Sequence, residues 1–363
     1  MDFSFTEAQT DLGRLTRDIV SDNVTEDRLR AVESGPDRFD RTLWTDLAEA
    51  GVLAASLPVD VGGAGYGLLE QCTVLVELGR AVAPVPYLPS IVVAAAAIAE
   101  FGTPQQRDRW VRPAAAGELV LTAALDDEVG EATTASMGSG RWWLSGVKTT
   151  VPAGPIADLF LVPAATPEGN AVFLVTPQDP GVTVRRQEIV DGDGEAMLDL
   201  DEVGLGADRV LGEGAAEWLA TRAILGQCAL QLGVLERALE LTASYATERV
   251  QFDRPIGTFQ AVAQRLADGY IDVEAARLTL WQAAWRLAEG LPARTEVATA
   301  KFWAADAGHR VAHTAVHVHG GVGIDKDYPL HRYFVAAKRN EFSMGGATAQ
   351  LRRIGAGLAA EPA

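Results

Sequence analysis

The stretch ERVQFDRPIGTFQ, residues 248–260, lies between two long runs of helical pattern and places two arginines around a phenylalanine. Pro255 lacks a backbone N–H and interrupts a helix, Gly257 permits unusual backbone angles, and Arg249 is favourable at the negative end of a helix dipole. Taken alone, the stretch is typical of a helix end. Its setting is unusual, because these cations occur in a chain whose formal net charge is −18.

The composition is that of an ordinary globular protein. The chain has 363 residues, of which 48% are hydrophobic, and this is enough for two or three domains with a sizeable core. Abundant alanine favours helix over sheet. The excess of carboxylates repels phosphate backbones and argues against nucleic acid as the main partner, but it leaves room for a phosphorylated small molecule at a local cationic site.

The N-terminus and the cysteines indicate a cytoplasmic protein. The opening MDFSFTEAQ is acidic and lacks the apolar core of a secretory signal. The apolar run IVVAAAAIA, residues 91–99, is too short to span a bilayer, so it predicts a buried core helix and no membrane span. Cys72 and Cys228 are the only cysteines and are far apart in sequence, which favours reduced thiols packed in the core.

Hydrophobic periodicity divides the chain into three predicted domains. Residues 1–118 carry apolar positions three and four apart and predict a helical domain. Residues 119–213 change to short apolar or alternating runs separated by Gly, Pro, Asp and Asn, which predict a β domain. Residues 214–363 return to long helical pieces, which predict an antiparallel helical bundle.

All five histidines lie between residues 309 and 331, and His309, His313 and His317 recur one helical turn apart. Two histidines at this spacing can bind zinc, but HRVAH lacks the glutamate of HExxH and the sequence offers no third ligand. We therefore expect no metal site. The pattern favours a face packed against neighbouring helices, with one histidine bonded to a ligand.

The stretch VHVHGGVGI, residues 316–324, ends a helix with two adjacent glycines. Gly320 and Gly321 are compatible with a simple C-cap, but glycine also lets backbone N–H groups approach a phosphate or ribose closely. Together, RVQFDRPIGTFQ and the later HVHGGVGI resemble the acyl-CoA dehydrogenase family. The resemblance covers nearly the whole chain and implies that family's fold: a helical N-terminal domain, a β-barrel-like middle domain and a C-terminal four-helix bundle.

The resemblance also implies a cofactor, FAD, whose adenine dinucleotide half crosses a subunit interface. Arg249 matches the arginine that neutralises the pyrophosphate of the neighbour's flavin, Phe252 the aromatic that packs on the cofactor, and Gln260 the glutamine that bonds its ribitol or adenosine part. The residues implied at the adenosine end are His317, Val318, His319, Gly320 and Gly321. Two positions depart from the family pattern, since Asp253 replaces glycine and His317 replaces glutamine.

Other family features are missing. The family holds its flavin ring with T-E-P-x-x-G-S-D and K-x-W-I-T, where this chain reads LTAALDDEVGEAT and KTTVPAG. The family's catalytic glutamate lies at one of two places, which correspond here to residues 344–346 and to Thr221; none of these can accept a proton. Glu341 and Glu217 lie nearby, and we expect both to be solvated surface charges. The resemblance therefore implies no catalytic residue in this chain.

The chain keeps the family's residues at the subunit interface but lacks its ring-binding motifs and its catalytic glutamate. In this it resembles the β subunits of actinobacterial α2β2 acyl-CoA dehydrogenases acting on steroid side chains. This implies a homologous catalytic α subunit as partner, FAD shared at the interface and an acyl-CoA thioester bound mainly by the partner. Two alternatives stay open. One is a self-sufficient homo-oligomeric dehydrogenase using Glu341 or Glu217 as base, and the other is a non-enzymatic assembly protein with this fold.

Overall fold

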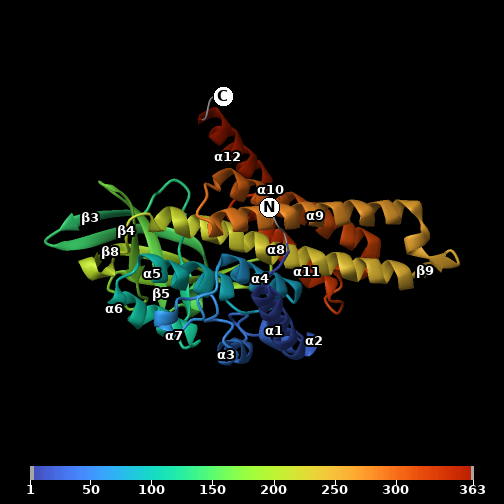
Figure 1. The fold of residues 1–363 in the computed structure, drawn as a ribbon, viewed down its shortest axis with the longest axis horizontal. Coiled ribbons are helices and arrows are strands. Elements are labelled where there is room, and N and C mark those ends of the chain that lie inside the picture. Colours follow the sequence, from blue (N-terminus) through green and yellow to red (C-terminus); the bar gives the residue numbers. More distant parts are fainter. Residues whose placement is uncertain (1–3, 361–363) are drawn as a thin grey trace. The chain divides into compact units, whose positions relative to one another are not determined.

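The computed structural model describes residues 4–360. The chain forms two compact units, one from residues 1–26, 68–83 and 224–363 and the other from residues 27–67 and 84–223. Secondary structure changes twice along the chain, from helices to strands after residue 115 and back to helices at residue 215 (Figure 1). The predicted domain limits lie in these two connections, but the compact units cut across them, so the three-domain division stays a prediction.

Between residues 4 and 360, seven long α-helices contribute to the first unit. They are α1 (Glu7–Asn23), α4 (Leu68–Arg80), α8 (Ala215–Glu248), α9 (Gln260–Ala288), α10 (Arg294–His319), α11 (Leu330–Phe342) and α12 (Ala347–Ala360). A capping box begins α1, in which the Thr6 hydroxyl accepts from the Gln9 backbone N–H and the Gln9 side chain accepts from the Thr6 N–H. The backbones of α4 and α8 cross closely: a Cβ on Gly79 would lie 2.2 Å from the carbonyl oxygen of Leu230.

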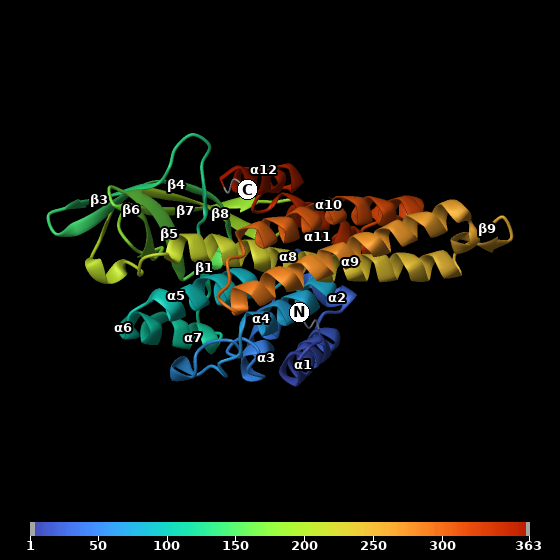
Figure 2. The same cartoon turned by 45° about the horizontal axis from the view of Figure 1, so that its top comes forward.

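The long helices of this unit form the predicted bundle. Residues 224–248 of α8 lie beside α9 and α10, since Glu236 bonds Arg277 of α9 and Gln231 bonds the Ala304 carbonyl of α10. Helix α10 packs against α9, α11 and α12 (Figure 2). By length and composition α8 could cross a membrane, but 72% of its apolar window is buried, as in the core helix of a folded protein. Cys72 and Cys228 are both buried and unbridged, which confirms the prediction of core thiols.

The second unit contains shorter helices and the sheet. Its helices are α2 (Glu26–Glu33), α3 (Arg41–Glu49), α5 (Ala96–Phe101), α6 (Pro104–Gln106) and α7 (Arg112–Ala115), with π-helical segments at Leu88–Ala95 and Arg107–Val111. The apolar run at 91–99 spans the end of the first π-helical segment and the start of α5. Its residues are buried, apart from Ala96, which is half-buried. This confirms the predicted core helix, although its first half has π rather than α geometry.

The strands of the middle region form one eight-stranded sheet. They are β1 (Leu121–Ala123), β2 (Asp126–Asp127), β3 (Thr134–Gly138), β4 (Arg141–Pro152), β5 (Leu159–Thr166), β6 (Gly169–Val175), β7 (Val182–Glu188) and β8 (Gly194–Leu205). The order is β1-β5-β3-β4-β8-β7, with β2 paired to β4 and β6 to β5. Leu144, Phe160 and Phe173 are fully buried in its core. The chain is thus mostly helical with a central β region, as predicted.

Candidate functional site

The ERVQFDRPIG stretch forms a hairpin. Helix α8 ends at Glu248, and strands β9 (Val250–Gln251) and β10 (Arg254–Pro255) pair in antiparallel fashion. The connecting residues Phe252 and Asp253 both have positive φ, 52° and 63°, which is the geometry of a type I′ turn. Since aspartate tolerates the left-handed region, Asp253 can replace the family's glycine without loss of the turn.

The hairpin presents its side chains to solvent. Arg249 is exposed and makes no side-chain hydrogen bond or ion pair with any residue between 4 and 360. Phe252 is 87% exposed and touches Phe259 only edge-on, at 6.2 Å between ring centroids. The guanidinium of Arg254, by contrast, lies 4.3 Å from the centre of the Phe259 ring. Gln260 is exposed at the first residue of α9.

The second predicted segment forms the end of α10 and a tight turn. His317 is exposed, whereas Val318 and His319 are buried. Gly320 has φ 65° and ψ −140°, a conformation that L-residues avoid. A Cβ on either Gly320 or Gly321 would meet nothing within 4 Å beyond its chain neighbours. Gly321 has no left-handed φ, so neither packing within the described chain nor its backbone angle explains a glycine there.

The structure brings these two segments together through a histidine and a tyrosine. The ring of His319 stacks on that of Tyr245, with centroids 4.2 Å apart and planes 22° from parallel. The carbonyl of Tyr245 accepts a hydrogen bond from the N–H of Arg249, at 2.8 Å, so this tyrosine lies one helical turn before the hairpin. The Tyr328 hydroxyl lies 3.2 Å from Nε2 of His319. Sequence reasoning missed both tyrosines, because no local pattern reports a stack between distant residues.

The other histidines of the predicted face contact α11. The rings of His309 and His313 lie 4.5 Å apart, Nδ1 of His309 is 3.1 Å from Nζ of Lys338, and His313 meets Phe334 edge-on. Burial, together with the neighbouring His309 and Lys338, lowers the pKa of His313. These two residues therefore contact α11, as predicted for a face near a neighbouring helix, but both side chains remain exposed. Between residues 4 and 360, no group of three or more His, Cys, Asp or Glu side chains is arranged to hold a metal ion.

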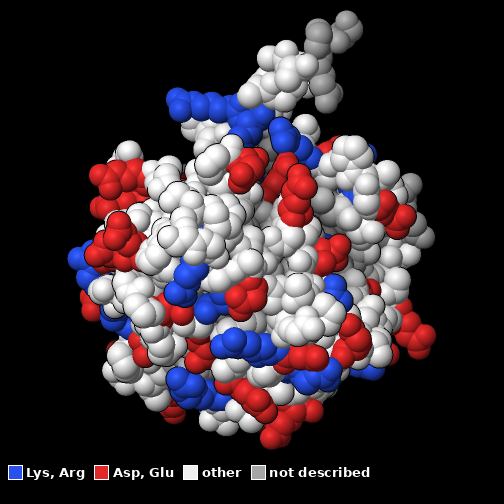
Figure 3. Space-filling model, turned by 90° about the vertical axis from the view of Figure 1, so that its left-hand side faces the viewer, with Lys and Arg blue, Asp and Glu red and all other residues white. Residues whose placement is uncertain are grey.

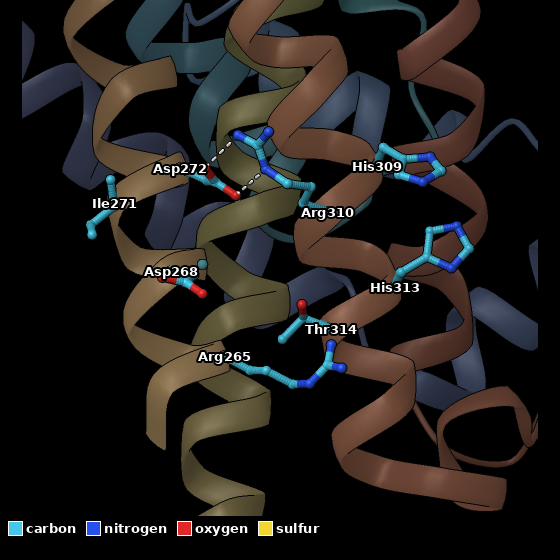
Figure 4. Close-up of a pocket in the computed structure, with 9 residues that line it drawn as sticks. Arg265, Asp268, Ile271, Asp272, His309, Arg310, His313 and Thr314 are labelled. Carbon is cyan, nitrogen blue, oxygen red and sulfur yellow. Dashed lines mark hydrogen bonds and ion pairs between the residues drawn. The ribbon is translucent and has the colours of Figure 1, made fainter. Parts of the chain in front are cut away.

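A polar pocket of about 440 Å³ lies between α9 and α10. Arg310 turns toward α9, where Nε and Nη2 bond the carboxylate of Asp272 at 2.7 and 2.6 Å (Figure 4). In the same view His309 and His313 point away from α9. The lining of this pocket includes none of the cofactor residues implied by the sequence, and two of its charged residues, Arg310 and Asp272, pair with each other.

In the second unit, the segments that correspond to the family's ring-binding motifs bond to each other. The Thr122 hydroxyl donates to the Pro152 carbonyl at 2.6 Å and is fully buried. Asp127 pairs with the buried ammonium of Lys148, also at 2.6 Å, and accepts two hydrogen bonds from Thr133. These polar groups are therefore satisfied within the chain itself.

The two family positions for a catalytic carboxylate carry none here. Met344 and Gly345 form a turn with φ 58° and 91°, and the amide of buried Gln350 donates to both of their carbonyls, at 3.1 and 2.9 Å. At the other position, the Thr221 hydroxyl donates to the Glu217 carbonyl, 2.9 Å away in α8.

The nearby glutamates differ from one another. Glu217 is exposed, as predicted. The prediction for Glu341 was wrong: its side chain is only 13% exposed and is bonded to Lys338 at 2.5 Å. His309 also approaches this carboxylate, at 3.4 Å, because the last turn of α11 packs against α10.

Charge on the face drawn in Figure 3, which is the left-hand side of Figure 1, is mixed. Asp and Glu alternate there with Lys and Arg, and among the described residues no continuous basic field covers this face. Such a surface lacks the clustered cations by which proteins hold a nucleic-acid backbone.

Comparison with protein families matches both helical regions. Residues 6–118 match the acyl-CoA dehydrogenase N-terminal domain, and residues 214–359 match the acyl-CoA dehydrogenase C-terminal domain. The chain is 53% identical to acyl-CoA dehydrogenase FadE27 of Mycobacterium tuberculosis over 373 aligned positions, which cover 100% of each chain.

Solved structures show the same fold. A chain of the ChsE4-ChsE5 complex from Mycobacterium tuberculosis is 54% identical, with 100% of each chain covered and a TM-score of 0.98. A chain of the Tcur3481-Tcur3483 steroid ACAD, in a G363A variant, is 45% identical, with 98% of this chain and 99% of that chain covered and a TM-score of 0.93. The predicted architecture of a helical N-terminal region, a curled β half-barrel and a C-terminal helical region is thereby confirmed.

Proposed function

Because the chain belongs to the acyl-CoA dehydrogenase family, we propose that it is the non-catalytic β subunit of a heterotetrameric member that oxidises a CoA thioester. Members of this family bind FAD and act on CH–CH groups. In the proposed α2β2 assembly, this chain completes the FAD site of a homologous α subunit, which supplies the base and most of the substrate pocket.

The observation that carries the proposal is an open face on the first unit, made of Arg249, Phe252, Gln260, Gly320 and Gly321. Tyr245 and His319 join the two segments that form it, yet Arg249 has no partner in the described chain and Gly321 has no packing reason to be glycine. A free guanidinium beside an unobstructed backbone turn fits a diphosphate and a ribose. These residues therefore suit the dinucleotide half of FAD.

In the proposed site, each residue of the open face has a separate task. Arg249 donates charge-assisted hydrogen bonds to the pyrophosphate, Phe252 covers an apolar part of the cofactor, and the amide of Gln260 bonds a hydroxyl of the sugar or ribitol. The backbone of His317–Gly321 lines the adenosine end. FAD, when bound, supplies the hydride acceptor of the reaction.

The catalytic half is assigned to the partner because this chain lacks its groups. Thr122 and Asp127, in the segment that corresponds to the ring-binding motif, are committed to Pro152 and Lys148. Glu341, the carboxylate nearest the family position at 344–346, is bonded to Lys338 and lies beside His309. A general base must be free to take a proton from substrate, and neither segment offers one.

The proposed substrate is a steroid side-chain CoA thioester of the 3-oxocholest-4-en-26-oyl type, desaturated between its α and β carbons during cholesterol side-chain degradation. The support comes from relatives: one is described as a two-protein complex, ChsE4-ChsE5, and another as a steroid ACAD with two named components.

Purification separates this proposal from its two alternatives. The chain is purified alone and after co-expression with a homologous acyl-CoA dehydrogenase, and flavin absorbance and sedimentation are recorded for both. The proposal requires colourless protein alone and a yellow heterotetramer on co-expression. Flavin bound tightly to the isolated chain would instead support a self-sufficient dehydrogenase that uses Glu341 or Glu217. Assembly without flavin in either sample would support the non-enzymatic protein.

A further inference from the structure

Three aromatic rings form a compact cluster beneath the glycine turn. Tyr245 comes from α8, His319 is the last residue of α10, and Tyr328 follows the turn at Gly320–Ile324. His319 lies between the tyrosines, 4.2 Å from the Tyr245 ring and 5.3 Å from the Tyr328 ring, and is 4% exposed. The two tyrosines also meet each other edge-on at 6.4 Å.

The hydrogen bonds of His319 determine which nitrogen carries its proton. Nδ1 lies 2.8 Å from the carbonyl oxygen of Ala315, and a carbonyl can only accept, so the proton is on Nδ1. Burial lowers the pKa of His319, which keeps the ring neutral near pH 7. Nε2 is then an acceptor, and the Tyr328 hydroxyl, 3.2 Å away, donates to it.

The cluster holds the inner side of the turn while the outer side stays open. Gly320, the next residue after His319, is in a conformation restricted to glycine, and a Cβ on Gly323 would lie 3.1 Å from Cβ of His319. Above Gly320 and Gly321 there is open space. On its inner side the turn therefore packs against Val316 and His319, whereas a Cβ on Gly320 or Gly321 would meet nothing within 4 Å among the described residues.

The same cluster links the turn to the arginine hairpin. The N–H of Arg249 donates to the carbonyl of Tyr245, so the ring that stacks on His319 belongs to the last turn of helix before the hairpin. A shift of His319 relative to Tyr245 would change the separation between the Gly320–Gly321 backbone and Arg249. A dinucleotide that bonds both would lose alignment with one of them.

We propose that Tyr245 and Tyr328 are positioning residues that act through the neutral His319 ring. They hold the Gly320–Gly321 turn at a fixed distance from Arg249. The strength of this hold determines how firmly the assembled protein retains the dinucleotide half of FAD. This inference rests on the proposed function. The titratable groups that face His319 are Tyr245 and Tyr328, and Glu248 on α8 acts in turn on Tyr328. Protonation of His319 removes the acceptor at Nε2 and places a charge in a buried site where no carboxylate of the described residues pairs with it.

The test begins with Tyr328→Phe in the co-expressed complex, with FAD dissociation measured by fluorescence. Loss of one net hydrogen bond should weaken FAD binding roughly three- to tenfold, with sedimentation unchanged. Tyr333→Phe is the matched control, because this buried tyrosine donates to the Arg80 carbonyl at 2.7 Å in the same unit and lies outside the cluster. It should lower the melting temperature but leave FAD dissociation unchanged.

Substitution of His319 tests whether Nε2 is the relevant atom. His319→Gln keeps an acceptor at the reach of Nε2 and should retain FAD better than His319→Asn, which reaches only the Nδ1 position. In the His319→Asn background, Tyr328→Phe should have no further effect, since its acceptor is already gone. Equal effects of Gln and Asn, or independent effects of Tyr328→Phe and His319→Asn, would overturn the proposal.

A measurement on the isolated chain separates this inference from the proposed function. Tyr328→Phe removes a bond to neutral His319, so it should raise the pKa of that ring, as followed by ¹⁵N NMR of labelled histidine. In the complex, FAD dissociation should become faster as pH falls through this pKa. In Tyr328→Phe the same increase should occur at a higher pH, because the pKa of His319 is raised. A shifted pKa with unchanged FAD retention would overturn the positioning role alone, whereas a complex that never binds FAD would overturn the proposed function.

Discussion

The hairpin at 249–255 and the segment at 341–346 contain the same kind of tight turn but differ in how far the turn is exposed to solvent. Each turns through two successive left-handed residues, Phe252 and Asp253 in one and Met344 and Gly345 in the other. The hairpin leaves Phe252 almost fully exposed, whereas the carbonyls of the second turn are bonded from within by buried Gln350. One turn presents its side chains to solvent, and the other is closed on its own core.

Buried hydrogen bonds hold the segment at 341–346 against the helices around it. Lys301 is completely buried and its ammonium donates to the carbonyl of Asn340 at 2.7 Å, at the end of α11. Asn340 is bonded in turn to Gln227 and Gln231 of α8. The segment that corresponds to the family's catalytic position is therefore anchored by a satisfied polar network, and its residues Met344, Gly345 and Gly346 carry no carboxylate.

The largest expected effect concerns this anchor. Burial lowers the pKa of Lys301 from its ordinary 10.5 to about 8, against the attraction of Glu341. Between these values the unfolded chain binds more protons at Lys301 than the folded one, so this residue should add about 3 kcal/mol to the free energy of unfolding as pH rises from about 8 to 10.5, and its contribution should stay flat just below 8. Above about pH 9 the buried Cys228, whose pKa is raised from 9.0 to about 12, acts in the opposite direction and offsets part of this rise. Denaturant titrations across this range measure it. Lys301→Met should abolish the rise, and a rise that survives in Lys301→Met would assign it to another group.

The next effect concerns the open face. Arg249→Ala should weaken FAD binding by the assembled complex roughly tenfold or more, since a charged hydrogen bond contributes about 1.5–3 kcal/mol. The isolated chain should keep its melting temperature, because Arg249 has no side-chain partner in the described chain. Arg254→Ala removes the same charge from the same hairpin and should change FAD titration much less. Equal losses in both variants would mean that only the hairpin's charge matters.

A pair of glycine substitutions distinguishes backbone strain from ligand approach. Gly320→Ala should destabilise the isolated chain by about 1–3 kcal/mol, because an L-residue is strained at φ 65°, ψ −140°. Gly321→Ala meets no such strain and should leave the melting temperature unchanged while lowering FAD retention in the complex. If Gly321→Ala binds FAD as the parent does, the cofactor does not approach this backbone.

The smallest expected effect is on turnover. Glu341→Gln and Glu217→Gln remove basicity at nearly constant shape, so the reconstituted complex should keep its rate within about threefold, whereas loss of a general base costs 10²- to 10⁴-fold. Steady-state oxidation of a steroid CoA thioester checks both. A loss of 10²-fold or more, with FAD content and assembly unchanged, would restore the self-sufficient dehydrogenase.

Several features were predictable because they depend on local rules. Apolar spacing predicted α8, α9 and α10, and the change to alternating runs predicted the strands between residues 121 and 205. The resemblance to the family identified the segments of the open face. The covered state of Glu341 was not predictable. Lys338 lies one turn away on the same helix, but His309 belongs to α10, and only the packing of α11 against α10 brings it near this carboxylate.

The sequence by itself determined the order of helices and strands and the identity of the groups available for chemistry, including the missing carboxylate, because periodicity and residue type act over a few neighbouring positions. Only the tertiary structure decided which of those groups are free. Packing of distant segments stacked Tyr245 on His319 and bonded Thr122 to Pro152, and between residues 4 and 360 it left the Arg249 side chain without a partner. These outcomes depend on pairs many residues apart, whose meeting is decided by burial of the whole core and not by any local pattern.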